Sequence, residues 1–395
     1  MSLSVGIVGL PNVGKSTLFN ALLKRQAALA ANYPFATIEP NVGVVPVPDE
    51  RLMALALTIA GKKVSDLESL KQQASLNGGQ VQDDKQEDLP PIKPATVEFV
   101  DIAGLVAGAS KGEGLGNKFL AHIRETNLIV HVLRDFQDAN VIREGAKDPV
   151  SDLKTIRLEL MLADLETLVK QKPPKGAKDK QELAKWQVIE KLKELLESET
   201  PVNRWLKGLS GDKRKLVLAV TKELGLITAK DELFVINVDE SALSQSVDQL
   251  TTKYAKNLSE EKNKVLVMSN KIESELSSLD EADQRLYLAD LGLSSSGLSR
   301  LIQAAYKTLG LQSFLTAGEK EVKAWTIKRG STAKQAAGVI HSDFEKKFIK
   351  AQVINWREFV LLGGWKQARA LGKVRQEGRD YIMQEGDVVE FMVGS

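Results

Sequence analysis

Eight residues near the N-terminus, Gly9 to Ser16, have the types and spacing of a phosphate-binding loop. They read GLPNVGKS and match the pattern G-x-x-x-x-G-K-[ST] in full, between a predicted strand and a predicted helix, which is the context that this motif needs. Glycine lets the backbone turn tightly enough for successive N–H groups to face phosphates, and the N-terminus of the following helix adds partial positive charge. We therefore predict that Lys15 neutralises the β- and γ-phosphates of a nucleotide and that the Ser16 hydroxyl binds Mg²⁺.

The other residues of this loop are predicted to line the same nucleotide. Their backbone N–H groups form a cradle for the phosphates, and Thr17 extends it toward the α-phosphate. The predicted nucleotide-binding residues of this region are Asn12, Val13, Gly14, Lys15, Ser16 and Thr17.

Two later segments supply groups that would complete the phosphate site. Asp101-Ile-Ala-Gly104 follows a predicted strand, at the position of the acidic residue that supports the metal ion in P-loop enzymes, and Gly104 can donate its N–H to the γ-phosphate. Between the loop and this segment lies PFATIEPN, in which Thr37 is predicted to bind Mg²⁺ only while the γ-phosphate is present. We predict catalytic roles for Lys15, Asp101 and Gly104, and metal-binding roles for Ser16 and Thr37.

Two segments compete for the role of reading the base. GTPases of this layout hold guanine with Asn-Lys-x-Asp, whose carboxylate accepts two N–H bonds from the base. The segment NVDE at 237–240 has lost the lysine and replaced Asp with Glu, whereas NKIE at 270–273 keeps Asn and Lys. Chain order favours 237–240, because the base-reading loop precedes one more strand, which is predicted over 264–268.

The favoured segment changes the expected base. The longer carboxylate of Glu240 no longer sits where the guanine N–H pair needs it, so ATP is the favoured substrate. Asn237, Val238 and Glu240 are predicted to face the base, and Met268 and Ser269 open the loop after the next strand. The alternative, a GTPase that reads guanine through Asn270–Glu273, stays open.

Leu105 follows Gly104 at a position where many GTPases carry a glutamine that orients the attacking water. A leucine neither donates nor accepts a hydrogen bond. We therefore expect slow intrinsic hydrolysis, or hydrolysis that uses another group, a K⁺ ion or a partner.

Short apolar strands that alternate with helices surround these motifs and indicate a parallel α/β sheet. The predicted strands cover 5–9, 41–47, 96–100, 128–133, 233–238 and 264–268, and the predicted helices of this part cover 16–24 and 51–60. Between about 149 and 209 the pattern changes to two long periodic helices joined by a basic, proline-containing turn, which predicts an antiparallel α-hairpin. The tail from about residue 312 reads strand, turn, helix, strand and ends in a strand over 388–393, which predicts a small α+β module.

Composition excludes several other classes of protein. The 395 residues are 27% charged and 43% apolar, which is ordinary for a globular chain and argues against disorder throughout. The absence of cysteine excludes disulfides, thiol catalysis and Fe–S clusters, and three scattered histidines make a histidine-rich metal site improbable. No apolar run approaches the ~20 residues of a membrane span, and we recognise no signal peptide, so a cytoplasmic protein without a membrane partner is expected.

The net charge of +2 conceals two basic regions. Residues 170–215 carry 13 Lys and Arg against 7 Asp and Glu, a local net of +6, and residues 311–395 carry 14 against 10, a net of +4. Basic surface on a projecting arm suits phosphate backbones, with salt-sensitive and sequence-nonspecific affinity. An RNA partner is therefore compatible with the composition.

Several long segments resemble one family closely, in order and over nearly the whole chain. They are GIVGLPNVGKSTLFNAL, NYPFATIEPNVGVVPVPDERL, FVDIAGLVAGASKGEGLGNKFL, LTAGEKEVKAWTI and GDVVEFMV, which are similar to the YchF/Obg-like ATPase family. The resemblance implies a P-loop domain of the translation-factor class, an inserted coiled-coil arm and a C-terminal TGS domain of β-grasp type. It also implies hydrolysis of ATP in preference to GTP, a hydrophobic residue at Leu105, and association with ribosomes.

Two features depart from that family. The polar stretch Lys62–Pro94 is longer than expected, and Arg143 stands where the family often has a histidine that has been considered for hydrolysis. Arginine stays protonated near pH 7 and cannot act as a general base, although it can stabilise phosphoryl charge. His131 gives no substitute, because it falls in a predicted strand and is interpreted as a core histidine.

These observations lead to one prediction. The fold class is α/β, with a P-loop domain at 1–134 and 210–310, a helical arm at 135–209 and a TGS domain at 311–395. The protein is expected to be a cytoplasmic, monomeric, Mg²⁺-dependent ATPase that works as a slow nucleotide-controlled switch on ribosomal RNA or ribosomal proteins. The alternatives are the GTPase named above and a ribosome-binding module whose hydrolysis is incidental.

Overall fold

The computed structural model describes residues 3–32, 41–62, 89–102, 115–136, 148–174, 179–244 and 246–394. Four residues singled out by the sequence, Thr37, Gly104, Leu105 and Arg143, lie outside these ranges, as does most of the polar stretch Lys62–Pro94. The described residues form two compact units, the first within 1–24, 34–43 and 98–274, and the second within 25–33, 44–97 and 275–395.

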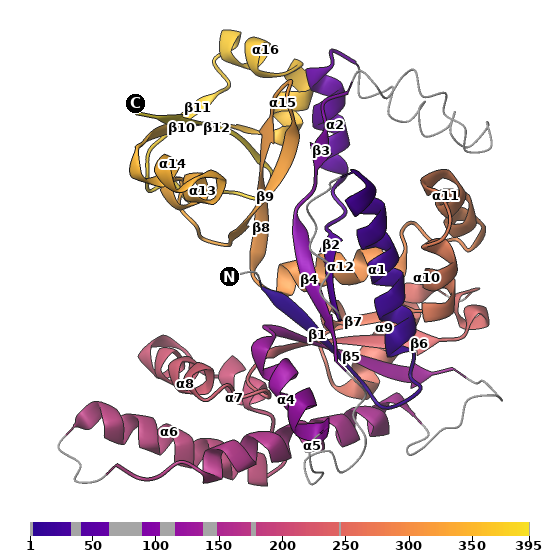
Figure 1. Cartoon of the computed structure of the whole chain (residues 1–395), viewed down its shortest axis with the longest axis vertical. Coiled ribbons are helices and arrows are strands. Elements are labelled where there is room, and N and C mark those ends of the chain that lie inside the picture. Colours follow the sequence, from indigo (N-terminus) through magenta and orange to yellow (C-terminus); the bar gives the residue numbers. More distant parts are fainter. Residues whose placement is uncertain are drawn as a thin grey trace. The chain divides into compact units, whose positions relative to one another are not determined.

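A six-stranded sheet organises the first unit, in the order β2-β4-β1-β5-β6-β7. The central pairs β1–β4, β1–β5, β5–β6 and β6–β7 are all parallel (Figure 1). β5 and β6 are buried over all but one residue each, as expected for strands covered on both faces. The strands are β1 (Ser4–Val8), β2 (Val42–Pro46), β4 (Thr96–Asp101), β5 (Leu128–Asp135), β6 (Asp231–Val238) and β7 (Val265–Met268).

Helices connect these strands, so the predicted parallel α/β fold is confirmed. α1 continues to Asn32, eight residues past the predicted end at 24, because no proline or glycine interrupts it. The helices are α1 (Lys15–Asn32), α4 (Leu115–Glu125), α5 (Pro149–Val169), α6 (Lys180–Glu197), α7 (Val202–Lys207), α8 (Gly211–Glu223), α9 (Val247–Leu258) and α10 (Asn270–Leu276), with short 3₁₀ turns η2 (Glu240–Ser244) and η3 (Lys262–Lys264).

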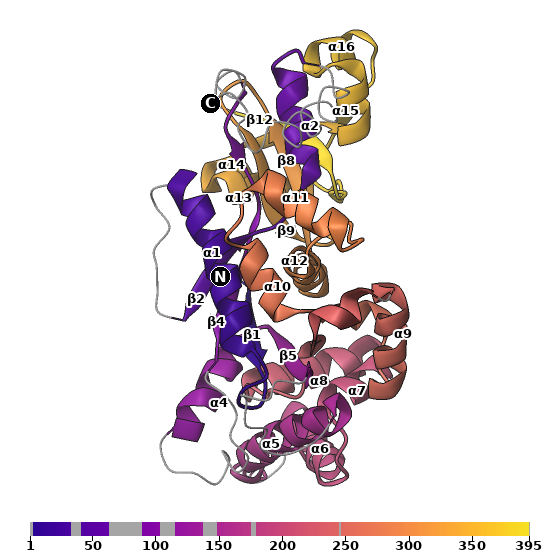
Figure 2. The same ribbon diagram turned by 90° about the vertical axis from the view of Figure 1, so that its right-hand side faces the viewer.

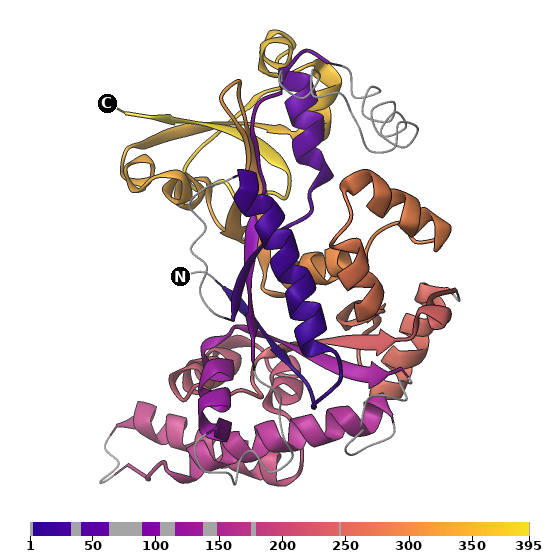
Figure 3. The same ribbon diagram turned by 45° about the vertical axis from the view of Figure 1, so that its right-hand side comes forward.

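The helical segment between β5 and β6 has a hydrophobic core of its own. Asp148 caps α5 by accepting hydrogen bonds from the N–H groups of Val150 and Ser151, and Asp179 caps α6 in the same way through Gln181. Figures 2 and 3 show α5 and α6 side by side, as the predicted hairpin requires. The core also takes in α7 and α8, which the sequence did not single out, through Met161, Leu168, Val188, Leu192, Leu196, Val202, Leu206, Val217, Val220 and Leu226.

A second six-stranded sheet, in the order β11-β10-β12-β8-β9-β3, organises the second unit. Its edge strand β3 pairs in parallel with β9, although the two are more than 200 residues apart in the chain. The strands are β3 (Ile92–Lys93), β8 (Leu311–Ala317), β9 (Val322–Lys328), β10 (Phe348–Asn355), β11 (Arg375–Glu377) and β12 (Asp387–Val393). The C-terminal α+β module is therefore present, and its sheet recruits a strand from the N-terminal half.

Seven helices of the described residues accompany this sheet. α13 covers one face, over a core that includes Phe314, Ala336 and Val353, and α2 packs against β8, β9 and α15. The helices are α2 (Glu50–Ile59), α11 (Glu281–Asp290), α12 (Gly297–Thr308), α13 (Ala333–Ile340), α14 (Ser342–Lys346), α15 (Trp356–Leu362) and α16 (Trp365–Ala370). Among the residues that the structure describes, none of the helices is both long and apolar enough to cross a bilayer.

Candidate nucleotide site

The phosphate loop lies between β1 and α1, with α1 beginning at Lys15. Asn12 and Gly14 both have positive φ angles, 61° and 96°. Gly9 is required for a different reason, since a Cβ there would lie 2.7 Å from the Val132 carbonyl oxygen of β5 and 2.9 Å from Val13 Cγ2. Val13 is buried and anchors the loop. The backbone is thus bent into the shape that the motif predicts.

Lys15 is the buried cation of the loop. Its side chain is 8% exposed, and Nζ donates a hydrogen bond to the Leu10 carbonyl at 2.7 Å. Burial lowers the pKa of Lys15 to about 8, against the opposing influence of the Asp101 carboxylate. Burial likewise raises the pKa of Asp101, which the Lys15 charge counteracts. A polyanion placed here would stabilise the charged form of Lys15, so the buried ammonium group favours the binding of phosphate.

Oxygen donors gather at this end of the sheet. Ser16 and Thr17 are exposed in the first turn of α1, and Asp101 is the last residue of β4, the strand beside β1. Hydroxyl and carboxylate oxygens are the ligands that Mg²⁺ prefers, together with phosphate oxygens and water. The donor set therefore fits Mg²⁺. The predicted partners Thr37 and Gly104 lie outside the described residues, and no group of three or more metal-ligating side chains occurs among those described.

Two asparagines at the ends of strands β6 and β7 hold the phosphate loop. Asn237, at the end of β6, donates from Nδ2 to the Val13 carbonyl at 3.0 Å, and its Oδ1 accepts from the Asn270 N–H at 2.9 Å. Asn270, just after β7, donates from its own Nδ2 to the Gly14 carbonyl at 3.0 Å. A Cβ at Gly14 would lie 2.5 Å from Asn237 Nδ2, so this glycine is also needed for the close approach of the amide.

The two candidate base-reading segments therefore have different geometries. Glu240 is exposed at the start of η2, directly after β6, where its carboxylate is open to a ligand. Glu273 is 3% exposed within α10, and its N–H bonds the Ser269 carbonyl as part of that helix. Val238, Met268 and Ser269 are all buried at the carboxyl ends of β6 and β7. From the sequence, Asn270 is predicted to belong to the competing base-reading segment 270–273. In the structure, Asn237 and Asn270 both bond the phosphate loop.

His131 occupies the core position that the sequence indicates. It is 0% exposed on β5, its Nε2 lies 2.8 Å from Glu232 Oε1, and its ring stacks on Phe234 with centroids 5.3 Å apart. Glu232 is the second residue of β6, so it lies at the opposite end of this strand from Asn237. The imidazole is therefore part of the packing of the sheet and of a buried charge cluster, away from the phosphate loop.

The fold and this site define a P-loop nucleoside triphosphatase of the GTPase class: a parallel sheet with a full phosphate loop after β1, an acidic residue ending β4 and an asparagine ending β6. A family model described as "50S ribosome-binding GTPase" matches residues 4–172. A second model, YchF-GTPase_C, described as "Protein of unknown function (DUF933)", matches residues 311–394.

Whole-length comparisons narrow the class to one family. The chain is 44% identical over 397 residues to the "Ribosome-binding ATPase YchF" of Bacillus subtilis, with 99% of each chain covered. It is also 44% identical to the protein of the same name in Escherichia coli O157:H7, again over 99% of each. A solved structure of the Schizosaccharomyces pombe YchF GTPase superposes with a TM-score of 0.78 at 32% identity, covering 99% of this chain and 98% of the other. This chain belongs to the YchF family, as its sequence predicts.

Proposed function

We propose that this protein hydrolyses ATP in a Mg²⁺-dependent reaction and works as a slow, nucleotide-controlled switch on the ribosome. The observation that carries the proposal is the phosphate loop held by two asparagines, with the exposed Glu240 beside it and the alternative carboxylate, Glu273, buried in a helix. The bacterial relatives are named ribosome-binding ATPases, which supports both the substrate and the partner.

Each residue has a role that follows from its position. Lys15 neutralises charge on the β- and γ-phosphates, while the loop from Asn12 to Thr17 presents N–H groups to the phosphate oxygens. When bound, Mg²⁺ would supply Lewis-acid stabilisation of phosphate charge, held by Ser16 and Thr37 and supported by Asp101. Gly104 senses the γ-phosphate. Catalysis in this site is positional and electrostatic, because phosphoryl transfer leaves little covalent chemistry for the protein.

Base recognition rests on the end of β6. Asn237, Val238 and Glu240 face the base, and Met268 and Ser269 close the far side of its pocket. Glu240 in place of aspartate disfavours guanine, so we propose that ATP binds more tightly than GTP. Leu105 gives no hydrogen bond to water, so intrinsic turnover is slow and is raised by K⁺ or by the ribosome.

The proposed organisation has three parts. Residues 1–134 and 210–310 form the P-loop domain, 135–209 the helical arm and 311–395 the TGS domain. α8 packs in the same core as α6, so we extend the helical arm to residue 223 and begin the second part of the P-loop domain at 224. The basic arm, with Lys213 and Lys215 exposed on α8, is the proposed contact with ribosomal RNA or protein. We place the protein in the cytoplasm as a monomer.

Titration calorimetry on the full-length protein tests the substrate. Mg-ATP and Mg-GTP are titrated into the wild type, Glu240→Gln and the matched variant Glu273→Gln, with Na⁺ or K⁺ in the buffer. We expect tighter binding of ATP, and a change of base selectivity in Glu240→Gln alone. Tighter binding of GTP, or a change confined to Glu273→Gln, would establish the GTPase alternative.

Co-sedimentation with ribosomes over a salt series tests the partner. Association that weakens as salt rises is expected for a basic contact surface. No association at low salt would refute it. If Lys15→Ala abolished hydrolysis but left every cellular function intact, hydrolysis would be incidental and the protein would be a ribosome-binding module.

A further inference from the structure

The C-terminal end of α4 is joined to the helical arm by one guanidinium group. Arg124, in the last turn of α4, donates from one nitrogen to the Gly225 carbonyl at 2.8 Å. Its other terminal nitrogen donates to the Ala163 carbonyl at 3.1 Å and to Thr167 Oγ1 at 2.9 Å, both on α5. One side chain thus bonds α5 and the connection between α8 and β6 at the same time.

Asp164 continues this contact on the α5 side. Its side chain is 0% exposed and lies 3.5 Å from Arg124. Oδ1 accepts from the Ile227 N–H at 2.9 Å, and Oδ2 accepts from the N–H and the hydroxyl of Thr228, each at 2.7 Å. A buried carboxylate is stable only when hydrogen bonds and an opposite charge replace the water it has lost. Asp164 has both, so it holds α5 to residues 227 and 228 while it lies beside Arg124 of α4.

Lys230, the residue before β6, bonds the end of α4. Its Nζ donates to the carbonyl groups of Ile123, Arg124 and Thr126, the last carbonyls of α4 and the turn after it. Carbonyl groups at the end of a helix lack partners inside it, and a cation placed on them also opposes the negative end of the helix dipole. The Ile123 carbonyl accepts from the N–H and hydroxyl of Thr126 as well. We call Arg124, Asp164, Thr167, Thr228 and Lys230 the α4 clasp.

Thr126, just after α4, and Ile102, just after Asp101, both border Gly6 of β1. Gly6, on β1, has no room for a side chain: a Cβ there would lie 2.8 Å from Ile102 Cδ1 and 3.0 Å from Thr126 Oγ1. Ile102 follows Asp101, and Thr126 follows α4. Ile102 and Thr126 therefore meet at Gly6, and Thr126 is bonded in turn by Lys230 of the α4 clasp.

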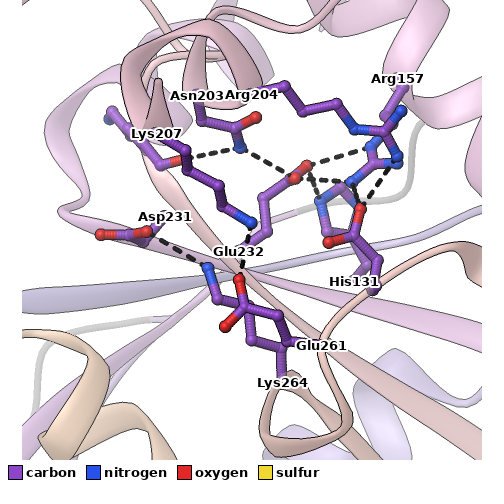
Figure 4. Close-up of polar contacts among 11 residues, drawn as sticks. His131, Arg157, Asn203, Arg204, Lys207, Asp231, Glu232, Glu261 and Lys264 are labelled. Atoms are coloured by element: carbon purple, nitrogen blue, oxygen red, sulfur yellow. Dashed lines mark hydrogen bonds and ion pairs between the residues drawn. The ribbon is translucent and has the colours of Figure 1, made fainter. Parts of the chain in front are cut away.

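A second cluster attaches α5 to the sheet independently of α4 (Figure 4). Arg157, two turns before Asp164, bonds Glu232 Oε2 at 2.7 Å and Glu260 Oε1 at 2.8 Å. His131 and Asn203 also bond Glu232, at 2.8 and 2.9 Å, and Arg204 bonds Glu260 at 3.1 Å. We call these residues, His131, Arg157, Asn203, Arg204, Glu232 and Glu260, the sheet clasp.

We propose that Arg124 is a positioning residue that couples the nucleotide site to the helical arm. The sheet clasp anchors α5 to strands β5 and β6, and the α4 clasp joins the arm to α4, the first described helix after Asp101. The inference rests on the proposed function, because it concerns how nucleotide controls the arm. Energetic coupling between sites of this kind typically changes an affinity by about 5- to 150-fold.

Amide hydrogen exchange of α5 to α8 measures this coupling. The full-length protein is compared with Mg-ADP and with a non-hydrolysable Mg-ATP analogue, as wild type, Arg124→Gln and the milder Thr167→Val. Arg204→Gln, in the sheet clasp, is the matched control. We expect the wild type and the control to show exchange rates in the arm that differ at least fivefold between the two nucleotides. In Arg124→Gln the ratio should approach one. In Thr167→Val, which removes only one of the bonds that Arg124 makes, together with the bond of Thr167 to the Ala163 carbonyl, it should be intermediate.

Calorimetry on the same samples separates the coupling from nucleotide binding itself. Arg124→Gln should bind the ATP analogue within about twofold of the wild type, because Arg124 does not belong to the phosphate site. An unchanged nucleotide response in both α4-clasp variants overturns the coupling, as does a wild-type arm that ignores nucleotide while calorimetry shows binding. If the wild type bound no nucleotide, the proposed function would fail first, and the coupling with it.

Discussion

The phosphate loop and the two clasps both place charged groups where water is scarce, but they are built over very different distances along the chain. Asn12, Gly14 and Lys15 lie within four residues, so the local backbone bends the loop, and two side chains, Asn237 and Asn270, hold it from 224 and 256 positions away. In the α4 clasp, Arg124 reaches residues 40 and 101 positions away, and in the sheet clasp His131 reaches Glu232 across 101 positions. The bend of the phosphate loop is thus set locally, whereas the contacts of the two clasps are all long-range.

The phosphate loop and the sheet clasp also differ in whether their buried charges are already paired. Burial lowers the pKa of Lys15 to about 8, so its charge is less stable there than in water and a bound anion would stabilise it. For Glu232, burial alone would raise the pKa, but the hydrogen bond from His131 and the charge of Arg157 lower it below its usual range. The buried charge of Lys15 would be paired by a bound anion, whereas the buried charges of the sheet clasp already pair with one another. Variants of the first should therefore affect chemistry, and variants of the second should affect stability.

The largest expected effect is on stability, from Glu232→Ala. This change leaves Arg157 and His131 buried without their shared acceptor, and breaking a buried pair in this way costs about 3–5 kcal/mol. Urea unfolding at neutral pH measures it. Because the folded pKa of Glu232 is depressed, the stabilisation is present above its unfolded pKa and is lost as pH falls toward the folded value. A variant within about 1 kcal/mol of the wild type would show that the sheet clasp contributes little.

The next largest effect is on catalysis, from Lys15→Ala. Loss of a charge-stabilising group from a preorganised site lowers kcat by about 100- to 1,000-fold. Steady-state ATP hydrolysis measures this, with Lys24→Ala, on the same helix, as control. The free energy of unfolding should not fall in Lys15→Ala, because the ammonium group is buried at a cost. An unfolding midpoint reduced as much as in Glu232→Ala would remove the proposed contrast between the two regions.

The third effect, on ATP binding, is smaller and distinguishes Asn237 from Asn270. Asn237→Ala removes the bond to the Val13 carbonyl, the bond from the Asn270 N–H and a group that we propose faces the base. Asn270→Ala removes the one side-chain bond to Gly14. Leaving a buried carbonyl without a partner costs about 1–3 kcal/mol. We expect both variants to weaken ATP binding in calorimetry, Asn237→Ala more strongly. A greater loss in Asn270→Ala would favour the segment 270–273 as the base-reading element.

The smallest effect is the pH dependence of ATP binding. Free Lys15 has a pKa of about 8 and must be protonated to hold phosphate, so binding takes up a proton above pH 8 and the affinity falls as pH rises. Titration from pH 7 to 8 should show a loss of about twofold, growing to about tenfold per unit at higher pH. Lys15→Arg, which stays charged, should flatten this slope. An equal slope in that variant would assign the titration to another group.

Much of the first unit could be predicted from the sequence because its signals are local. The strands β1, β4, β5, β6 and β7 are short apolar runs next to turn residues, and the parallel fold follows from their alternation with helices. The helical arm was predicted as two helices, yet α7 and α8 share its core. Their apolar positions, such as Val202 and Val220, are buried only because α5 and α6 already lie beside them.

The sequence by itself determined the phosphate loop and the class of protein, because glycine, lysine and serine at fixed spacing act through backbone geometry within one turn of chain. It also determined that His131 lies in the core. Only the tertiary structure decided that Asn270 bonds the loop beside Asn237, that β3 joins the C-terminal sheet, and that Arg124 meets Asp164. These pairings join residues 40 to more than 200 positions apart, and the free energy that selects them comes from burial and hydrogen bonding that exist only once the strands and helices have packed.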